Sequence, residues 1–137
     1  MLEAGKGLGL QQAGLKALAS LRMEKAYRDY GHDMDNTDTL LGVGLGFTAD
    51  YDKPLGFIGK AFVVKERDEA KRKGGLQSRL TQLLVLDPLP LMYHGEVVYR
   101  DGKVVGDVRS ASYGNPNLYI QTTTQFNPNL TQLNPQL

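Results

Sequence analysis

The segment from Ser20 to Asp33 concentrates side chains that could bind a flat, polar ligand. Arg22 precedes two tyrosines, Tyr27 and Tyr30, and acidic residues lie between them. A guanidinium offers a fork of donors and can stack on a ring, whereas a tyrosine presents an apolar face with one polar tip. These residue types suit a flat heterocycle. The alternative from residue types alone is that the tyrosines cover a core and the charges are solvated.

Two helices are expected to carry and flank this segment. The first runs from about Leu10 to Arg22, because its leucines recur at helical spacing on one face, at positions 15, 18 and 21. The second runs from about Phe57 to Lys73, where an apolar first half is followed by a run of charges. Glycines at 74 and 75 predict a left-handed end to that helix.

The strands are expected mainly in the second half of the chain. Leu45 to Tyr51 is predicted as an early strand, and Arg79 to Leu86 as a largely buried one. Asp101-Gly102 is the strongest hairpin signal and joins strands at 96–100 and 103–108. Val98 is predicted to face Val105 across that hairpin.

Composition excludes several classes of protein. The 137-residue chain is 41% hydrophobic, and 16 basic against 15 acidic residues leave a net charge of +1. Such a balance gives no field for nucleic acid or an anionic membrane. With no cysteine there is neither a disulfide nor a thiolate metal site. No apolar run approaches the roughly 18 residues of a membrane span, so a soluble protein is expected.

Two motifs resemble ligand loops without meeting their requirements. The glycines at 5, 7 and 9 follow no strand and lack dinucleotide-loop spacing. Asp33, Asp35 and Asp38 could suggest a calcium loop, but the glycine and the final glutamate of such a loop are missing. A solvated turn is therefore expected there, and no metal site is predicted.

Four segments, in order, resemble the aminomethyltransferase family. This family includes the glycine cleavage T-protein and the folate-binding half of FAD-linked sarcosine and dimethylglycine dehydrogenases. The segments are S-L-R-x-E-K-x-Y-R-x-x-G-x-D at 20–33, T-D-T-L-L-G-V-G-L-G-F at 37–47, D-K-P-L-G-F-I-G-K at 52–60 and G-E-V-V-Y-R-D-G-K-V-V-G-D-V-R-S-A-S-Y-G at 95–114. K-A-Y-R-D-Y-G-H-D and V-R-S-A-S-Y-G look more like the FAD-linked dehydrogenases than the stand-alone T-protein.

The resemblance implies an α+β fold in three parts. Residues 1–76 would be the C-terminal part of the folate-binding domain, and 77–114 a partial antiparallel Greek-key β-barrel. Residues 115–137 repeat N-P-N-L and carry no charge, so a disordered low-complexity tail is expected there. The barrel would then lack its closing strand and leave an open edge along 103–112, through which the chain would self-associate.

The resemblance also implies a ligand. Arg22 and Tyr30 would line a tetrahydrofolate cleft, and Arg109 would either cap it or be a charge at a strand edge. Leu40 and Gly42 replace the proline and glutamate of the family motif T-P-x-E-A-G-L.

The family's catalytic aspartate lies in an N-terminal half that this chain lacks, so no catalytic residue is predicted, and whether the chain is itself an enzyme stays open. It would be a fragment acting in one-carbon transfer, with folate and a small N-methyl amine as partners and FAD only in a longer parent protein. The alternative is a non-catalytic module resembling the regulatory subunit of pyruvate dehydrogenase phosphatase. Cytoplasm and mitochondrial matrix both remain open.

Overall fold

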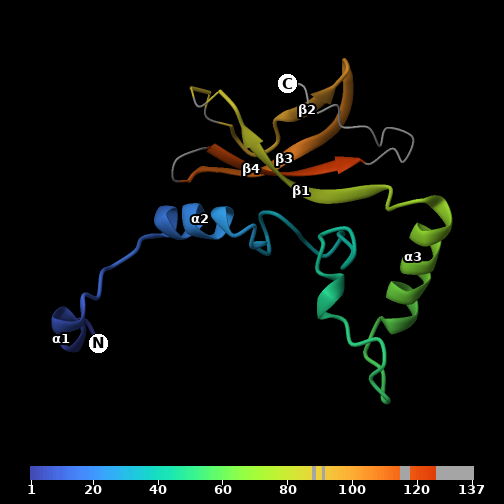
Figure 1. Ribbon diagram of the computed structural model, residues 1–137, viewed down its shortest axis with the longest axis horizontal. Helices are drawn as coiled ribbons and strands as arrows, with labels where there is room; N and C mark the ends of the chain where they lie inside the picture. The colour runs from blue at the N-terminus through green and yellow to red at the C-terminus, as the bar shows by residue number, and fades with distance from the viewer. Residues whose placement is uncertain (88, 91, 115–117, 126–137) are drawn as a thin grey trace.

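The computed structural model describes residues 1–87, 89–90, 92–114 and 118–125, and it has helices first and strands second (Figure 1). This order confirms the α+β class. The α-helices are α1 (Leu2–Gly5), α2 (Leu15–Glu24) and α3 (Lys60–Lys73), and single 3-10 turns occupy Lys6–Leu8 and Gly46–Thr48. The strands are β1 (Ser78–Val85), β2 (Val97–Arg100), β3 (Lys103–Tyr113) and β4 (Leu118–Gln125).

The four strands form one antiparallel sheet in the order β1-β4-β3-β2. Strand β4 pairs with β1 over its whole length, from Ser78 opposite Gln125 to Val85 opposite Leu118. On its other side β4 pairs with β3. The last of the described strands is therefore an inner strand of the sheet. Closure of these strands into a Greek-key barrel stays a prediction.

The disorder predicted for 115–137 is wrong over Leu118–Gln125, which is strand β4. Its residues, L-Y-I-Q-T-T-T-Q, combine aromatic and β-branched types that favour strands. The prediction used the composition of the whole 115–137 tract, and the Asn-Pro motifs on either side of this segment outweighed its strand-forming residues. The open edge predicted along 103–112 is also wrong in its location, because β4 pairs with β3 there. Residues 115–117 and 126–137 lie outside the described part, and self-association stays a prediction.

Both long helices begin later than predicted. Helix α2 starts at Leu15, after Gly14 in an extended conformation, and not at Leu10. Helix α3 starts at Lys60 because Gly59 has φ 86°, which is outside the helical region. Its predicted end is confirmed: Gly74 has φ 79° and donates its N–H to the carbonyl of Ala70.

The strand predicted for Leu45–Tyr51 is wrong. A 3-10 turn at Gly46–Thr48 replaces it, and Phe47 is 84% exposed. Gly46 lies within the predicted strand, and glycine in a strand weakens it.

The hairpin at Asp101-Gly102 is confirmed. Both residues have positive φ, 51° and 72°, as a two-residue turn matching the twist of the strands requires. The predicted pairing of Val98 with Val105 is wrong, because a bulge shifts the register and puts Val98 opposite Gly106.

Helix α2 lies on one face of the sheet, against β3 and β4 (Figure 1). The buried apolar side chains among the described residues are few: Met23, Val43, Val63, Leu80 and Val108. Asp33 is the buried charged residue in this part of the chain, and it is the centre of the site described below. No described helix is both long and apolar enough to cross a bilayer.

The turn geometry predicts a cost for a side chain at Gly102. Gly102→Val should destabilise the chain by about 1–2 kcal/mol, because an L-residue is strained at positive φ. Urea unfolding followed by circular dichroism measures this change. Asp101→Asn is the matched control, since asparagine tolerates positive φ, and equal losses for both variants would contradict the turn assignment.

Candidate functional site

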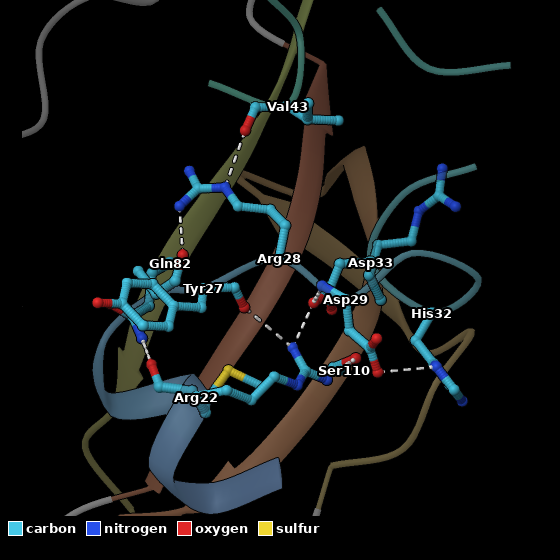
Figure 2. A network of polar contacts seen from close by, with 12 residues as sticks. Arg22, Tyr27, Arg28, Asp29, His32, Asp33, Val43, Gln82 and Ser110 are labelled. Atoms are coloured by element: carbon cyan, nitrogen blue, oxygen red, sulfur yellow. Dashed lines mark hydrogen bonds and ion pairs between the residues drawn. The ribbon is translucent and has the colours of Figure 1, made fainter. Parts of the chain in front are cut away.

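Arg22 joins three parts of the fold (Figure 2). Its side chain, near the end of α2, is 13% exposed. Nη1 donates to Oδ2 of Asp33 and, at 3.3 Å, to the carbonyl of Tyr27, while Nη2 donates at 3.1 Å to Oγ of Ser110 on β3. The guanidinium thus connects the helix, the loop after it and the sheet.

Asp33 organises the loop that follows α2. Its side chain is fully buried, and Oδ2 accepts the backbone N–H of Asp29 at 2.8 Å in addition to Arg22. Backbone bonds close the same loop, from Asp33 N to Asp29 O at 2.9 Å and from Gly31 N to Met34 O at 2.8 Å. The solvated turn expected for Asp33 is therefore wrong, because the loop folds its carboxylate onto Arg22.

Tyr30 projects from this loop and is 67% exposed. Its backbone forms a bridge with Met34, so its position follows the loop that Asp33 holds. Arg22 and Tyr30 therefore belong to one local structure. They differ in how far a ligand could reach them, because the arginine bonds within the protein, whereas the tyrosine presents its ring to solvent.

Arg109 lies in β3 at the irregularity that shifts the β3–β4 register between Val108 and Ser110, so both of its expected roles, capping the cleft or a charge at a strand edge, stay predictions. Its guanidinium forms ion pairs with Asp107 at 3.4 Å and Asp38 at 3.8 Å. Its carbonyl accepts a hydrogen bond from Nδ1 of His94 at 2.9 Å. None of these bonds joins Arg109 to Arg22 or Tyr30.

The sequence analysis did not assign a role to Arg28, although it lies in the same motif. Nε of Arg28 donates to the carbonyl of Val43 at 2.8 Å, and Nη1 donates to that of Ala26 (Figure 2). Gln82 of β1 also donates, to the carbonyl of Met23. Arg28 thereby fixes the 37–47 segment against the loop. The position of Arg28 between two tyrosines is the sequence signal that could have identified its role.

Gly42, where the family motif has glutamate, fits tightly against Thr39. The backbone N–H of Gly42 donates to Oγ1 of Thr39 at 2.9 Å, and that hydroxyl donates to Oε1 of Glu66 on α3 at 2.6 Å. A Cβ at position 42 would lie 2.8 Å from this Oγ1. Any side chain at position 42 would displace the Thr39 hydroxyl. The loop therefore requires glycine at the position where the family motif has glutamate. These residues line a cavity of about 250 Å³ between α3 and β1.

Asp35 forms a tight turn with Thr37. The hydroxyl and the backbone N–H of Thr37 both donate to Oδ1 of Asp35, at 2.6 and 2.7 Å. These two bonds lower the pKa of Asp35, the hydroxyl most, and the charge of Arg109 lowers it further. Within the described residues, no group of three or more metal-ligating side chains is present.

Comparison with known proteins finds relatives of this sequence. Residues 1–53 match the model of the GCVT N-terminal domain. The chain is 39% identical over 118 residues to an aminomethyltransferase of Clostridium botulinum, a match that covers 86% of this chain. The chain is homologous to the aminomethyltransferases. The expected resemblance to this family is thereby confirmed.

An oxidase and a dehydrogenase match as well. A 4-methylaminobutanoate oxidase (formaldehyde-forming) of Paenarthrobacter nicotinovorans is 43% identical over 112 residues, and human mitochondrial sarcosine dehydrogenase is 38% identical over 114 residues. These matches cover 82% and 83% of this chain. The sequence is thus similar to both branches of the homologous proteins, the methyl-amine-oxidising enzymes and the aminomethyltransferases.

The fold agrees with this assignment. The glycine cleavage system aminomethyltransferase T of Bartonella henselae has a TM-score of 0.73 to this chain over 90% of its length, at 20% identity. The chain spans only part of each homologue: 35% of that structure, 30% of the Clostridium protein, 13% of the oxidase and 12% of the sarcosine dehydrogenase.

The Arg22–Asp33 pair predicts a large effect of removing one partner. Asp33→Ala should destabilise the chain by about 3–5 kcal/mol, because it leaves the buried guanidinium without its counter-charge. Chemical denaturation measures the loss. Asp29→Ala is the control: it removes a carboxylate that is 48% exposed and pairs with His32, so it should cost less than about 1 kcal/mol. Equal losses would refute the special role of Asp33.

The Asp35 turn predicts a shift in titration. Thr37→Val removes the hydroxyl donor and should raise the pKa of Asp35 toward its ordinary value, as measured by carboxyl-carbon NMR. Because the folded-state pKa is lowered, this carboxylate stabilises the fold above the ordinary aspartate pKa and loses that effect as pH falls through the folded value. Thr48→Val, which removes only a bond to the Leu45 carbonyl, should leave Asp35 unchanged.

Proposed function

We propose that this chain forms one wall of a tetrahydrofolate site in a protein that transfers a one-carbon unit from a small N-methyl amine. The observation that carries the proposal is the exposed Tyr30 on a loop held by the buried Arg22–Asp33 pair. A ring fixed in this way can stack on a flat heterocycle without first becoming ordered. Homology to aminomethyltransferases and methyl-amine oxidases supports the same ligand class.

The residues divide into two roles. Tyr30 is the proposed contact for the pterin ring, because 67% of its surface is open. Arg22 is a positioning residue, since Asp33, Ser110 and the Tyr27 carbonyl already accept from its two terminal nitrogens. Arg109 stays a candidate contact at a second point, and its ion pairs with Asp38 and Asp107 would keep its side chain extended.

Tetrahydrofolate, when bound, supplies the nitrogen that accepts the one-carbon unit. The proposed domain arrangement is the end of a folate-binding domain over residues 1–76 and the start of a β-barrel domain from 77. A flavin site and a catalytic aspartate would belong to a longer parent protein. The alternative, a non-catalytic regulatory module, has no support from the homologues named above.

The test is a tetrahydrofolate titration of the chain followed by backbone NMR. Binding should be weak, with dissociation constants above the micromolar range, because only one wall is present, and shifts should centre on residues 29–34. Tyr30→Ala should reduce affinity by about 1–3 kcal/mol, the value of stacking a base on an aromatic side chain. The fold should be unaffected, since Tyr30 is exposed.

Tyr99→Ala is the matched control, because Tyr99 on β2 is similarly exposed, at 64%. It should leave the titration unchanged. Micromolar binding to this chain alone would overturn the single-wall proposal, and equal effects of the two substitutions would overturn the assignment of Tyr30.

A further inference from the structure

Strand β2 is at one end of the strand order β1-β4-β3-β2, so among the described strands it pairs with β3 alone. The carbonyl of Glu96, just before β2, accepts the N–H of Val108 on β3 at 2.8 Å. Successive residues of an antiparallel strand bond to alternate sides. The backbone N–H and C=O groups of Val97 and Tyr99 therefore point away from β3, toward the outer side of the sheet.

The bulge in the β2–β3 pair leaves this outer side regular. Val98 lies opposite Gly106. The next residue, Tyr99, lies opposite Val104, so the extra residue, Val105, belongs to β3. A bulge in an edge strand bends that strand and interrupts its ladder, which protects the edge from pairing. Because the bulge is on β3, β2 keeps its alternation and its outer side can continue the ladder.

One face of this edge is apolar and exposed. Val97 and Tyr99 are two residues apart, so their side chains point to the same face. Val104 lies opposite Tyr99 and shares that face, and all three side chains are half or more exposed. Pairs of an aromatic and a β-branched residue on neighbouring strands stabilise a sheet. The edge therefore suits a partner strand that carries the same residue types.

The two ends of the same edge carry opposite charges. Glu96 is exposed just before β2, and Arg100 is the last residue of the strand. If β2 strands from two copies pair antiparallel around Val98, Glu96 of each copy lies opposite Arg100 of the other, and such pairs stabilise a sheet. Arg100 can keep its neighbour Asp101, at 3.9 Å, in this arrangement. A parallel arrangement would place Glu96 beside Glu96, which is unfavourable.

The same register also satisfies the backbone. Val97 of each copy lies opposite Tyr99 of the other, and both residues have outward-pointing N–H and C=O groups. Residues paired in this way exchange both of their hydrogen bonds. The formal net charge of the chain is only +1, so two copies repel each other little. Backbone, apolar face and charged ends therefore all favour one register.

We propose that β2 is an interaction surface for a second copy of this chain, whose own β2 adds antiparallel around a two-fold axis at Val98. The self-association expected from the sequence is thereby assigned to β2 and not to residues 103–112. The strand has only four residues, so the dimer belongs with the weak complexes that bury less than about 1,200 Å². The surface shares no residue with the proposed folate wall, and either proposal can fail without the other.

Sedimentation equilibrium of the full chain over a range of concentrations tests the association. The chain should show a monomer–dimer equilibrium with a dissociation constant of roughly 10 µM to 1 mM. Glu96→Lys and Arg100→Glu each place like charges opposite each other at both ends of the paired strands. Each variant alone should therefore associate at least about tenfold more weakly. A chain that stays monomeric throughout this range would overturn the proposal.

Mixing the two variants tests the register. In an equimolar mixture of Glu96→Lys and Arg100→Glu, opposite charges again meet at both ends, so a heterodimer should form with about the affinity of the unmodified chain. Variants that had failed to fold would not regain association on mixing, and circular dichroism checks their folding. A mixture that associates no more strongly than either variant alone would contradict the antiparallel register.

Two matched controls separate this edge from the rest of the surface. Asp52→Lys changes the net charge as Glu96→Lys does, at an exposed position outside β2, and should leave the dimer intact. Tyr99→Ala removes two cross-strand pairs and should weaken the dimer by roughly twofold to thirtyfold. Tyr30→Ala, at another exposed tyrosine, should not weaken it. The assignment to β2 is wrong if Asp52→Lys acts like Glu96→Lys, or if the two tyrosine variants behave alike.

Discussion

The local structure around the proposed folate wall depends on one buried ion pair, Arg22 with Asp33. Taking two charges out of water is costly, and such a pair is kept only when further hydrogen bonds satisfy both groups. Here Ser110 and the Tyr27 carbonyl accept from the guanidinium and the Asp29 N–H donates to Oδ2 of Asp33, while Oδ1 of Asp33 is buried without a hydrogen-bond partner among the described residues. The bonds come from the helix, the loop and the sheet, so the pair determines how these three parts meet.

The pair also shows which features of this segment the sequence could predict and which it could not. The motif identified Arg22 and Tyr30 together, and the structure does bring them into one local unit. Residue types could not reveal that Asp33 is buried, because its only local signal was a turn-forming sequence rich in aspartate and asparagine. Arg22, the ion-pair partner of Asp33, is held in turn by Ser110, which is 88 residues away from Arg22.

The other elements also divide into those determined by the residues at the position itself and those determined by contacts distant in sequence. Gly74 and Asp101-Gly102 were predictable because their backbone angles depend on the residues themselves. The strand at 118–125 was missed because its stability comes from pairing with β1 and β3, which composition does not report. Gly42 also depends on contacts distant in sequence. The space at position 42 is limited by the hydroxyl of Thr39, which is bonded to Glu66 on α3.

The position of β4 between β1 and β3 has a consequence for how the chain acquires its structure. Strand β1 is made before β2, β3 and β4, yet its partner in the sheet is β4, the last of these four. During synthesis β1 would emerge with its hydrogen-bonding groups unpaired, while the β2–β3 hairpin could form as soon as its turn exists. Pairing two strands that lie this far apart in sequence costs loop-closure entropy before any stabilising contact forms. Folding of this sheet should therefore be limited by the arrival of β4, and β1 is the strand most exposed to wrong partners until then.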